Sequence, residues 1–148
     1  MMDLIKYCHD HGIDDILKLP DVVERVELYF EHAAKAKEQL QRCSTVHGNL
    51  LVLDLRKEET IYAVNRFMVY ALFPHTNISI HVLWGLQQQN TVFATGKSIT
   101  NRSANTDIGA LMLTYGGGGH ANAGTCQVDN DRATDVLQQL IGKINADG

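Results

Sequence analysis

Residues 115–124 read Tyr-Gly-Gly-Gly-Gly-His-Ala-Asn-Ala-Gly. Four consecutive glycines bury no side chain and cost backbone entropy, so packing alone is a poor explanation for them. Their N–H groups can approach a ligand closely, and successive N–H groups form a concave anion-binding site. His120 adds a donor that can carry charge near neutral pH. The run predicts an anion site made by Gly116, Gly117, Gly118, Gly119 and His120.

The alternative for this run is a flexible loop with an incidental histidine. A linker normally carries serine and charged residues around its glycines. Here the glycines instead lie between an apolar helical pattern and a short strand pattern. The surroundings therefore favour the anion site.

Around the glycines, the chain alternates between strand and helix patterns. Strand patterns cover residues 50–55, 77–84, 91–98 and 124–128, and helical patterns cover residues 58–73, 107–115 and 130–144. Residues 85–90 favour a hairpin between two of the strands, and Asp107 is placed to cap a helix. Strands that alternate with helices predict an α/β (α+β) fold, in which helices flank a mixed β-sheet.

Residues 1–45 are predicted to form a helical linker that precedes this sheet domain of residues 46–148. A short helix ends at Gly12, and Pro20-Asp21 opens a long one. Apolar residues along the long helix recur at steps of three and four: Val22, Val26, Tyr29, Ala33, Ala36, Leu40 and Cys43. This narrow seam predicts that one side of the helix packs against another surface. The pair His9 and His11 does not share a helix face, and we expect no metal there.

The composition is that of an ordinary globular chain of 148 residues, with 45% hydrophobic and 20% charged residues. No apolar run is long enough to cross a membrane, and the start does not read as a signal peptide. The net charge is −4 and there is no basic run, which argues against a long track for a polynucleotide. Three separated cysteines (Cys8, Cys43 and Cys126) predict reduced thiols without a metal, in a cytoplasmic protein.

A second polar stretch follows the strand pattern that ends at Ser98. Its residues Asn101, Arg102 and Ser103 lie where a rigid strand can direct a loop, and arginine recognises phosphate through two parallel hydrogen bonds. A solvated turn in which Arg102 pairs with Asp107 fits the sequence equally well.

Two other motifs are weaker candidates for a functional site. Gly96-Lys97-Ser98 lacks the first glycine of a P-loop, and Cys126 is expected to be buried in a strand.

The order Asn101-Arg102-Ser103, a short helix, and then GGGGHANAG leading into a strand resembles the C-terminal DHHA1 domain of the DHH phosphoesterases. This superfamily includes oligoribonucleases, cyclic-dinucleotide phosphodiesterases and exopolyphosphatase-related proteins. The resemblance covers residues 46–148, and the upstream helices resemble the linker between the family's two domains. It implies that Arg102, Asn101, Ser103 and the 116–120 loop hold the substrate phosphate and terminal nucleotide.

The resemblance also implies parts that this sequence lacks. In the family, an N-terminal DHH domain binds two metals, typically Mn²⁺, and activates water. No Asp-His-His motif is present here, so we expect no catalytic residue and no metal in this chain, which would be the C-terminal part of a longer enzyme. Expected partners are a short oligonucleotide, a cyclic dinucleotide, a nucleotide or a polyphosphate, the N-terminal DHH domain, and a second copy in a homodimer, but no membrane. A stand-alone nucleotide- or phosphate-binding module and a transfer-RNA editing accessory domain remain as alternatives.

Overall fold

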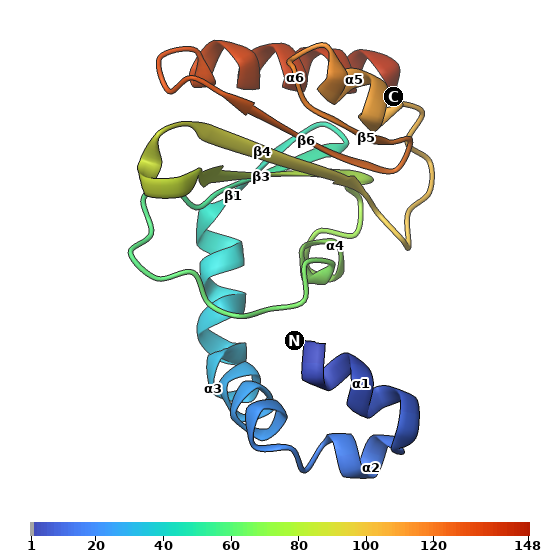
Figure 1. Ribbon diagram of the computed structural model, residues 1–148. Helices are drawn as coiled ribbons and strands as arrows, with labels where there is room; N and C mark the ends of the chain where they lie inside the picture. Colours follow the sequence, from blue (N-terminus) through green and yellow to red (C-terminus); the bar gives the residue numbers. More distant parts are fainter. Residues whose placement is uncertain (1) are drawn as a thin grey trace.

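A mixed six-stranded sheet lies at the centre of the computed structural model, which describes residues 2–148, with side chains from Leu4 onward (Figure 1). The strands are ordered β1-β2-β3-β4-β6-β5. Their bounds are β1 Ser44–His47, β2 Leu50–Asp54, β3 Ile78–Trp84, β4 Thr91–Lys97, β5 Gly118–His120 and β6 Ala123–Val128. Only β2 and β3 run parallel, and the other neighbours are antiparallel. The predicted mixed sheet flanked by helices is confirmed.

Helices α5 (Ile108–Leu113) and α6 (Ala133–Asp147) cover one face of the sheet (Figure 1). Alternate residues of β2, β3, β4 and β6 point toward these two helices and form the larger core with them. Phe93 lies at its centre and is fully buried. Asp107 caps α5 as predicted, since its carboxylate accepts the Ala110 N–H at 2.9 Å.

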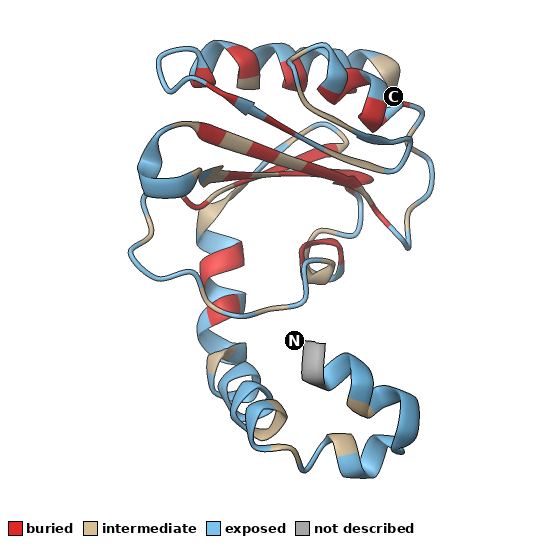
Figure 2. Cartoon of the chain, viewed as in Figure 1, coloured by how far each residue is buried: buried red, intermediate tan, exposed pale blue. Residues whose placement is uncertain are grey.

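The opposite face is covered over only half of its width. Helix α4 (Met68–Leu72) and the last turns of α3 (Pro20–Cys43) form a smaller core with β2 there, around Leu40, Leu53 and Val69. No residue of β4, β5 or β6 takes part in this core. Along β6, exposed residues on this face alternate with buried ones on the other (Figure 2). This half of the sheet therefore faces solvent in the described residues, and we call it the open face.

The N-terminal helices form an arm that extends from the sheet (Figure 1). The arm consists of α1 (Met2–Asp10), α2 (Ile13–Ile16) and the part of α3 up to Lys35. Proline occupies the first turn of α3, as predicted. The predicted seam packs only at its end, where Ala36 and Leu40 are buried, while Val26 is 37% and Tyr29 38% exposed. None of the helices formed by residues 2–148 is long and apolar enough to cross a membrane.

Two predictions of secondary structure were wrong. The helix predicted over residues 58–73 is reduced to α4, because residues 55–67 form an irregular loop whose backbone bonds to side chains of α3. Pro74 does end the shortened helix, as expected. The second error concerns β1 and β5, which were not predicted, and β5 contains two glycines of the run. Both strands are short and lie at the sheet edges, where few residues carry a strand pattern.

Candidate functional site

The first two glycines of the run end helix α5. Gly116 has a φ of +77°, and its N–H donates to the Leu113 carbonyl at 3.0 Å. The Gly117 N–H donates to the Met112 carbonyl, also at 3.0 Å, which completes a Schellman cap. These two N–H groups are therefore already used within the chain, and the expectation that Gly116 and Gly117 offer them to an anion is corrected.

Close packing explains more of the run than the sequence suggested. A Cβ on Gly117 would overlap the Thr125 carbonyl oxygen and lie 2.6 Å from Cys126 Cα. A Cβ on Gly109 of α5 would lie 2.8 Å from the Gly119 carbonyl carbon. Helix α5 thus rests directly on the β5 backbone, and β5 approaches β6 where only glycine fits.

Gly118, Gly119 and His120 remain as candidate donors of the run. They form β5, the edge strand, paired with β6. Because successive N–H groups of a strand point to opposite sides, one of the two glycine N–H groups points away from β6. The His120 ring is exposed, and its Nδ1 accepts the Asn122 N–H at 3.4 Å. This long contact leaves His120 available to a ligand.

The loop that carries Arg102 is fixed by a chain of amide and hydroxyl groups. The Asn49 side chain donates to Asn77 Oδ1 at 2.8 Å, Asn77 Nδ2 donates to Ser103 Oγ at 2.9 Å, and Ser103 Oγ donates to Asn101 Oδ1 at 2.8 Å. Asn77 is buried between the strands and the loop. The side chains of Asn101 and Ser103 therefore orient the loop, whereas the exposed Arg102 side chain takes no part in this chain of hydrogen bonds.

Arg102 lies on a hollow of about 360 Å³ at the end of β4, lined also by Lys97, Ser98, Ile99, Ala104 and Asn122. The Arg102 Nε–H donates to the Ile99 carbonyl at 3.3 Å, and Lys97 Nζ donates to the Ala104 carbonyl at 3.2 Å. Among residues 4–148, neither cation forms an ion pair, so Arg102 does not pair with Asp107. Two positive charges next to neutral hydrogen-bonding groups suit a phosphate.

The hollow joins the two stretches that the sequence singled out. Asn122 belongs to the turn that follows His120, and the Lys97 N–H donates to the Asn122 carbonyl at 2.9 Å. The glycines and His120 are not among the residues that line the hollow. Lys97 and Asn122 were missed as site residues, although the strand end at Lys97 was a usable signal. The supporting role of Asn77 has no signature in the sequence.

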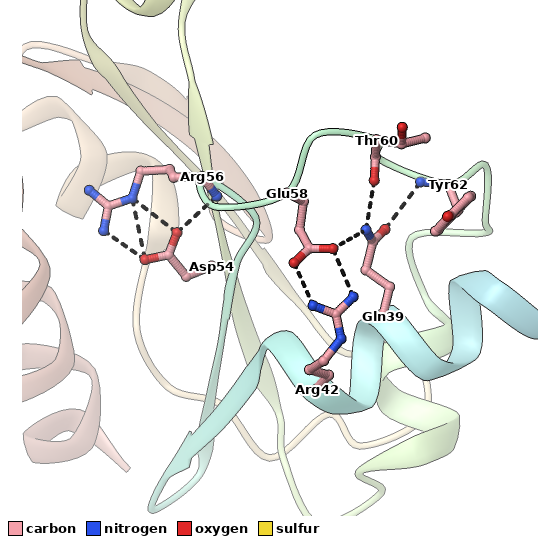
Figure 3. A network of polar contacts seen from close by, with 7 residues as sticks. All are labelled: Gln39, Arg42, Asp54, Arg56, Glu58, Thr60 and Tyr62. Carbon is pink, nitrogen blue, oxygen red and sulfur yellow. Dashed lines mark hydrogen bonds and ion pairs between the residues drawn. The ribbon is translucent and has the colours of Figure 1, made fainter.

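A polar network fixes residues 55–67 to helix α3 (Figure 3). The Gln39 amide donates to Glu58 Oε2 and to the Thr60 carbonyl, both at 2.7 Å, and its oxygen accepts the Tyr62 N–H at 3.1 Å. Arg42 donates two hydrogen bonds to the Glu58 carboxylate, at 2.6 and 2.8 Å. The Thr60 carbonyl and the Tyr62 N–H are thereby hydrogen-bonded without a helix.

Glu58 makes this network sensitive to acid. Its hydrogen bonds to Arg42 and then Gln39 lower the pKa of the carboxyl from 4.5 to about 2. A pKa lowered by folding stabilises the native state above pH 4.5, and this stabilisation is lost as the pH falls toward 2. We expect Glu58→Gln to lower the melting temperature near neutral pH and the difference from wild type to shrink over that window.

Melting curves of wild type, Glu58→Gln and a Glu59→Gln control across this pH range check the prediction. Glu59 is the exposed neighbour, so its replacement should follow the wild-type curve. A difference between wild type and Glu58→Gln that stays constant with pH would contradict the assigned role.

Other candidate chemistry is not assembled. Residues 4–148 contain no group of three or more His, Cys, Asp or Glu side chains placed to hold a metal ion, so we assign no step through a metal to these residues. His9 bonds to the neighbouring Asp10, and both are exposed. All three cysteines are free. Burial raises the pKa of the Cys126 thiol to about 11, which keeps it protonated, in line with its dismissal as a nucleophile.

No protein-family model and no curated protein sequence matches the chain. Among solved structures, it is similar to the pGpG-specific phosphodiesterase PggH from Vibrio cholerae, with 62% sequence identity and a TM-score of 0.85. That similarity covers 99% of this chain and 50% of PggH, so the chain spans half the length of this relative.

Two more distant structures share the fold. An exopolyphosphatase-related protein from Bacteroides fragilis is 18% identical with a TM-score of 0.58, over 90% of this chain and 39% of its own. A DHH-domain structure described as a member of a family of ribosomal proteins is 16% identical with a TM-score of 0.52, over 88% of this chain and 36% of its own.

Proposed function

Because the chain belongs to the DHH phosphoesterase superfamily, we propose that it binds the substrate of a phosphodiesterase that acts on a short phosphorylated dinucleotide. The hollow that holds Arg102 and Lys97 beside the β5–β6 turn carries this proposal. It offers one phosphate group an amide side chain and two cations that form no ion pair within residues 4–148. The 62% identity to a pGpG-specific enzyme favours a dinucleotide over a polyphosphate.

Arg102 has the main part in this proposal. Its planar guanidinium would bind two phosphate oxygens, with Lys97 as a second charge. His120 would donate to the same phosphate or to a sugar hydroxyl, and one N–H of Gly118 or Gly119 would add a neutral donor. Asn101 and Ser103 would act as positioning residues for Arg102. Together these groups would hold the ester in one orientation, which is a proximity contribution to catalysis.

In this proposal, hydrolysis takes place on a separate DHH domain and not on residues of this chain. The resemblance implies a DHH domain with two Mn²⁺ ions, and such metals would activate the attacking water. That domain is the first partner that we propose, and the open face is available to it. A homodimer remains a further proposal, as does a cytoplasmic location, which the three free thiols favour.

Titration of the ¹⁵N-labelled chain tests the proposed function. We expect pGpG and GMP to shift the amide signals of residues 97–104 and 118–123, because both ligands bring a phosphate to the hollow. Guanosine, which has the same base and sugar without phosphate, is the matched control and should leave these signals in place. Inorganic polyphosphate bound more tightly than pGpG would assign the other substrate class, and an unperturbed hollow with every ligand would contradict the proposal.

A further inference from the structure

A row of paired residues on the open face leads from helix α4 to His120. Ser79 pairs with Gly96, Gly96 with Ala123, and Ala123 with His120, on four neighbouring strands. Directly paired residues point to the same side of a sheet. The Ser79 hydroxyl lies 2.9 Å from the hydroxyl of Tyr70 in α4, so the row lies on the side of the sheet that carries α4 over β2 and β3 and the open face farther along. His120 therefore points to the open face, beyond two very small residues.

The guanidinium of Arg66, in the loop before α4, lies against this row at Gly96. A Cβ built on Gly96 would lie 2.8 Å from Arg66 Nη2, so the guanidinium rests on the β4 backbone where no side chain intervenes. It also lies over the Phe67 ring, 5.4 Å from the centroid. Arg66 is exposed and, within residues 4–148, has no hydrogen bond or ion pair through its side chain.

The nearby histidine does not supply a competing charge. Burial first, and the Arg66 charge second, lower the pKa of His81 to about 4, so its ring is neutral at pH 7. Next to α4, this side of the sheet thus carries one fixed positive charge, that of Arg66. It lies against Gly96, which is paired with Ala123.

The network on α3 holds Arg66 in this position. Gln39, Arg42 and Glu58 fix residues 58–62, and the His32 ring accepts the Ala63 N–H at 3.2 Å. Met68 then begins α4. Arg66 is therefore on a short segment anchored at both ends, which lowers the entropy cost of placing its charge.

From these observations we infer that Arg66 is a second phosphate-binding residue, which binds a different phosphate of the substrate from the one held by Arg102. The inference rests on the proposed function. Gly96 and His120 are separated by two strand spacings, about 10 Å, which is the order of one nucleotide. Figure 1 shows the loop after β4 descending at the sheet end toward the side that carries α4. A dinucleotide with two phosphates could therefore reach both arginines.

The test compares one ligand with two phosphates and one with a single phosphate. Dissociation constants of pGpG and GMP are measured for wild type, Arg66→Gln, Arg66→Lys and Arg102→Ala. We expect Arg66→Gln to weaken pGpG binding roughly tenfold or more and to leave GMP binding unchanged. Arg66→Lys should lose less, since it keeps the charge but not the planar fork. Arg102→Ala should weaken both ligands.

Each result decides between the two proposals. Equal effects of Arg66→Gln on both ligands, no effect on either, or equal wild-type affinities for pGpG and GMP would overturn the role of Arg66 and leave the proposed function standing. No binding of either ligand to wild type would overturn both. The amide spectrum of each variant verifies its fold, and Arg66→Lys carries the comparison if Arg66→Gln does not fold.

Discussion

Replacing Gly117 with alanine is expected to lower the free energy of unfolding by about 3 kcal/mol or more. The added Cβ would overlap the Thr125 carbonyl and lie 2.7 Å from Cys126 Cβ, so β6 or the end of α5 must move. Both are parts of the larger core. For a domain of this size, the melting temperature should fall by roughly 10 °C.

Gly118 is the matched control for this prediction. No heavy atom lies within 4 Å of a Cβ built there, and its φ is not positive. Alanine in a strand is favoured over glycine by about 0.5–1 kcal/mol, so Gly118→Ala should leave stability unchanged or raise it slightly. Thermal melts of the two variants check the contrast. Equal losses at Gly117 and Gly118 would mean that the run does not pack against β6 as described.

Replacing Arg102 with alanine is expected to weaken binding of GMP roughly tenfold to hundredfold, because a charge-assisted hydrogen bond contributes about 1.5–3 kcal/mol. The loss should appear in affinity alone. Arg102 is exposed, and within residues 4–148 its side chain makes one hydrogen bond, of 3.3 Å and within its own loop, so we expect the fold not to depend on it. Isothermal titration of wild type and Arg102→Ala measures the effect. Arg132→Ala, which removes the same charge from an exposed position next to α6, should bind as wild type does.

His120→Ala allows the shared phosphate to be tested. If Arg102 and His120 contact one phosphate, the loss in the double variant should be smaller than the sum of the two single losses. Strictly additive losses would place the two side chains on separate parts of the ligand. Unchanged affinity in Arg102→Ala would contradict the proposed site altogether.

The elements with long, regular patterns were predictable from the sequence. Alternation in β3 and β4, and the apolar face of α6, reflect which residues the sheet and its helices bury. Loop 55–67 was not predictable, because its helical spacing was overridden by contacts with Gln39 and Arg42, which lie some twenty residues earlier. Local sequence carries no record of such long-range partners.

The site was predictable in part, for a similar reason. Arg102 and His120 could be proposed from the sequence because a glycine run that ends in histidine, and an arginine beside serine and asparagine, are typical of anion sites; their roles stay predictions. The same reasoning treated four glycines alike, whereas Gly116 and Gly117 serve the end of α5, and Gly118 and Gly119 form an edge strand. The role that we propose for Arg66 had no signal in the sequence, since it depends on the small residue Gly96, which becomes the neighbour of Arg66 only in the folded sheet.

The exposed N-terminal arm has a consequence for how the chain unfolds. No residue from Leu4 to Lys35 is buried, so melting of α1 and α2 exposes little additional surface. Denaturant dependence of the unfolding free energy scales with newly exposed surface, and it should therefore be that of a chain shorter than 148 residues. Amide protons of the arm should exchange with solvent through local fraying. Those of β2, β3 and β4 should exchange only when the whole sheet opens cooperatively.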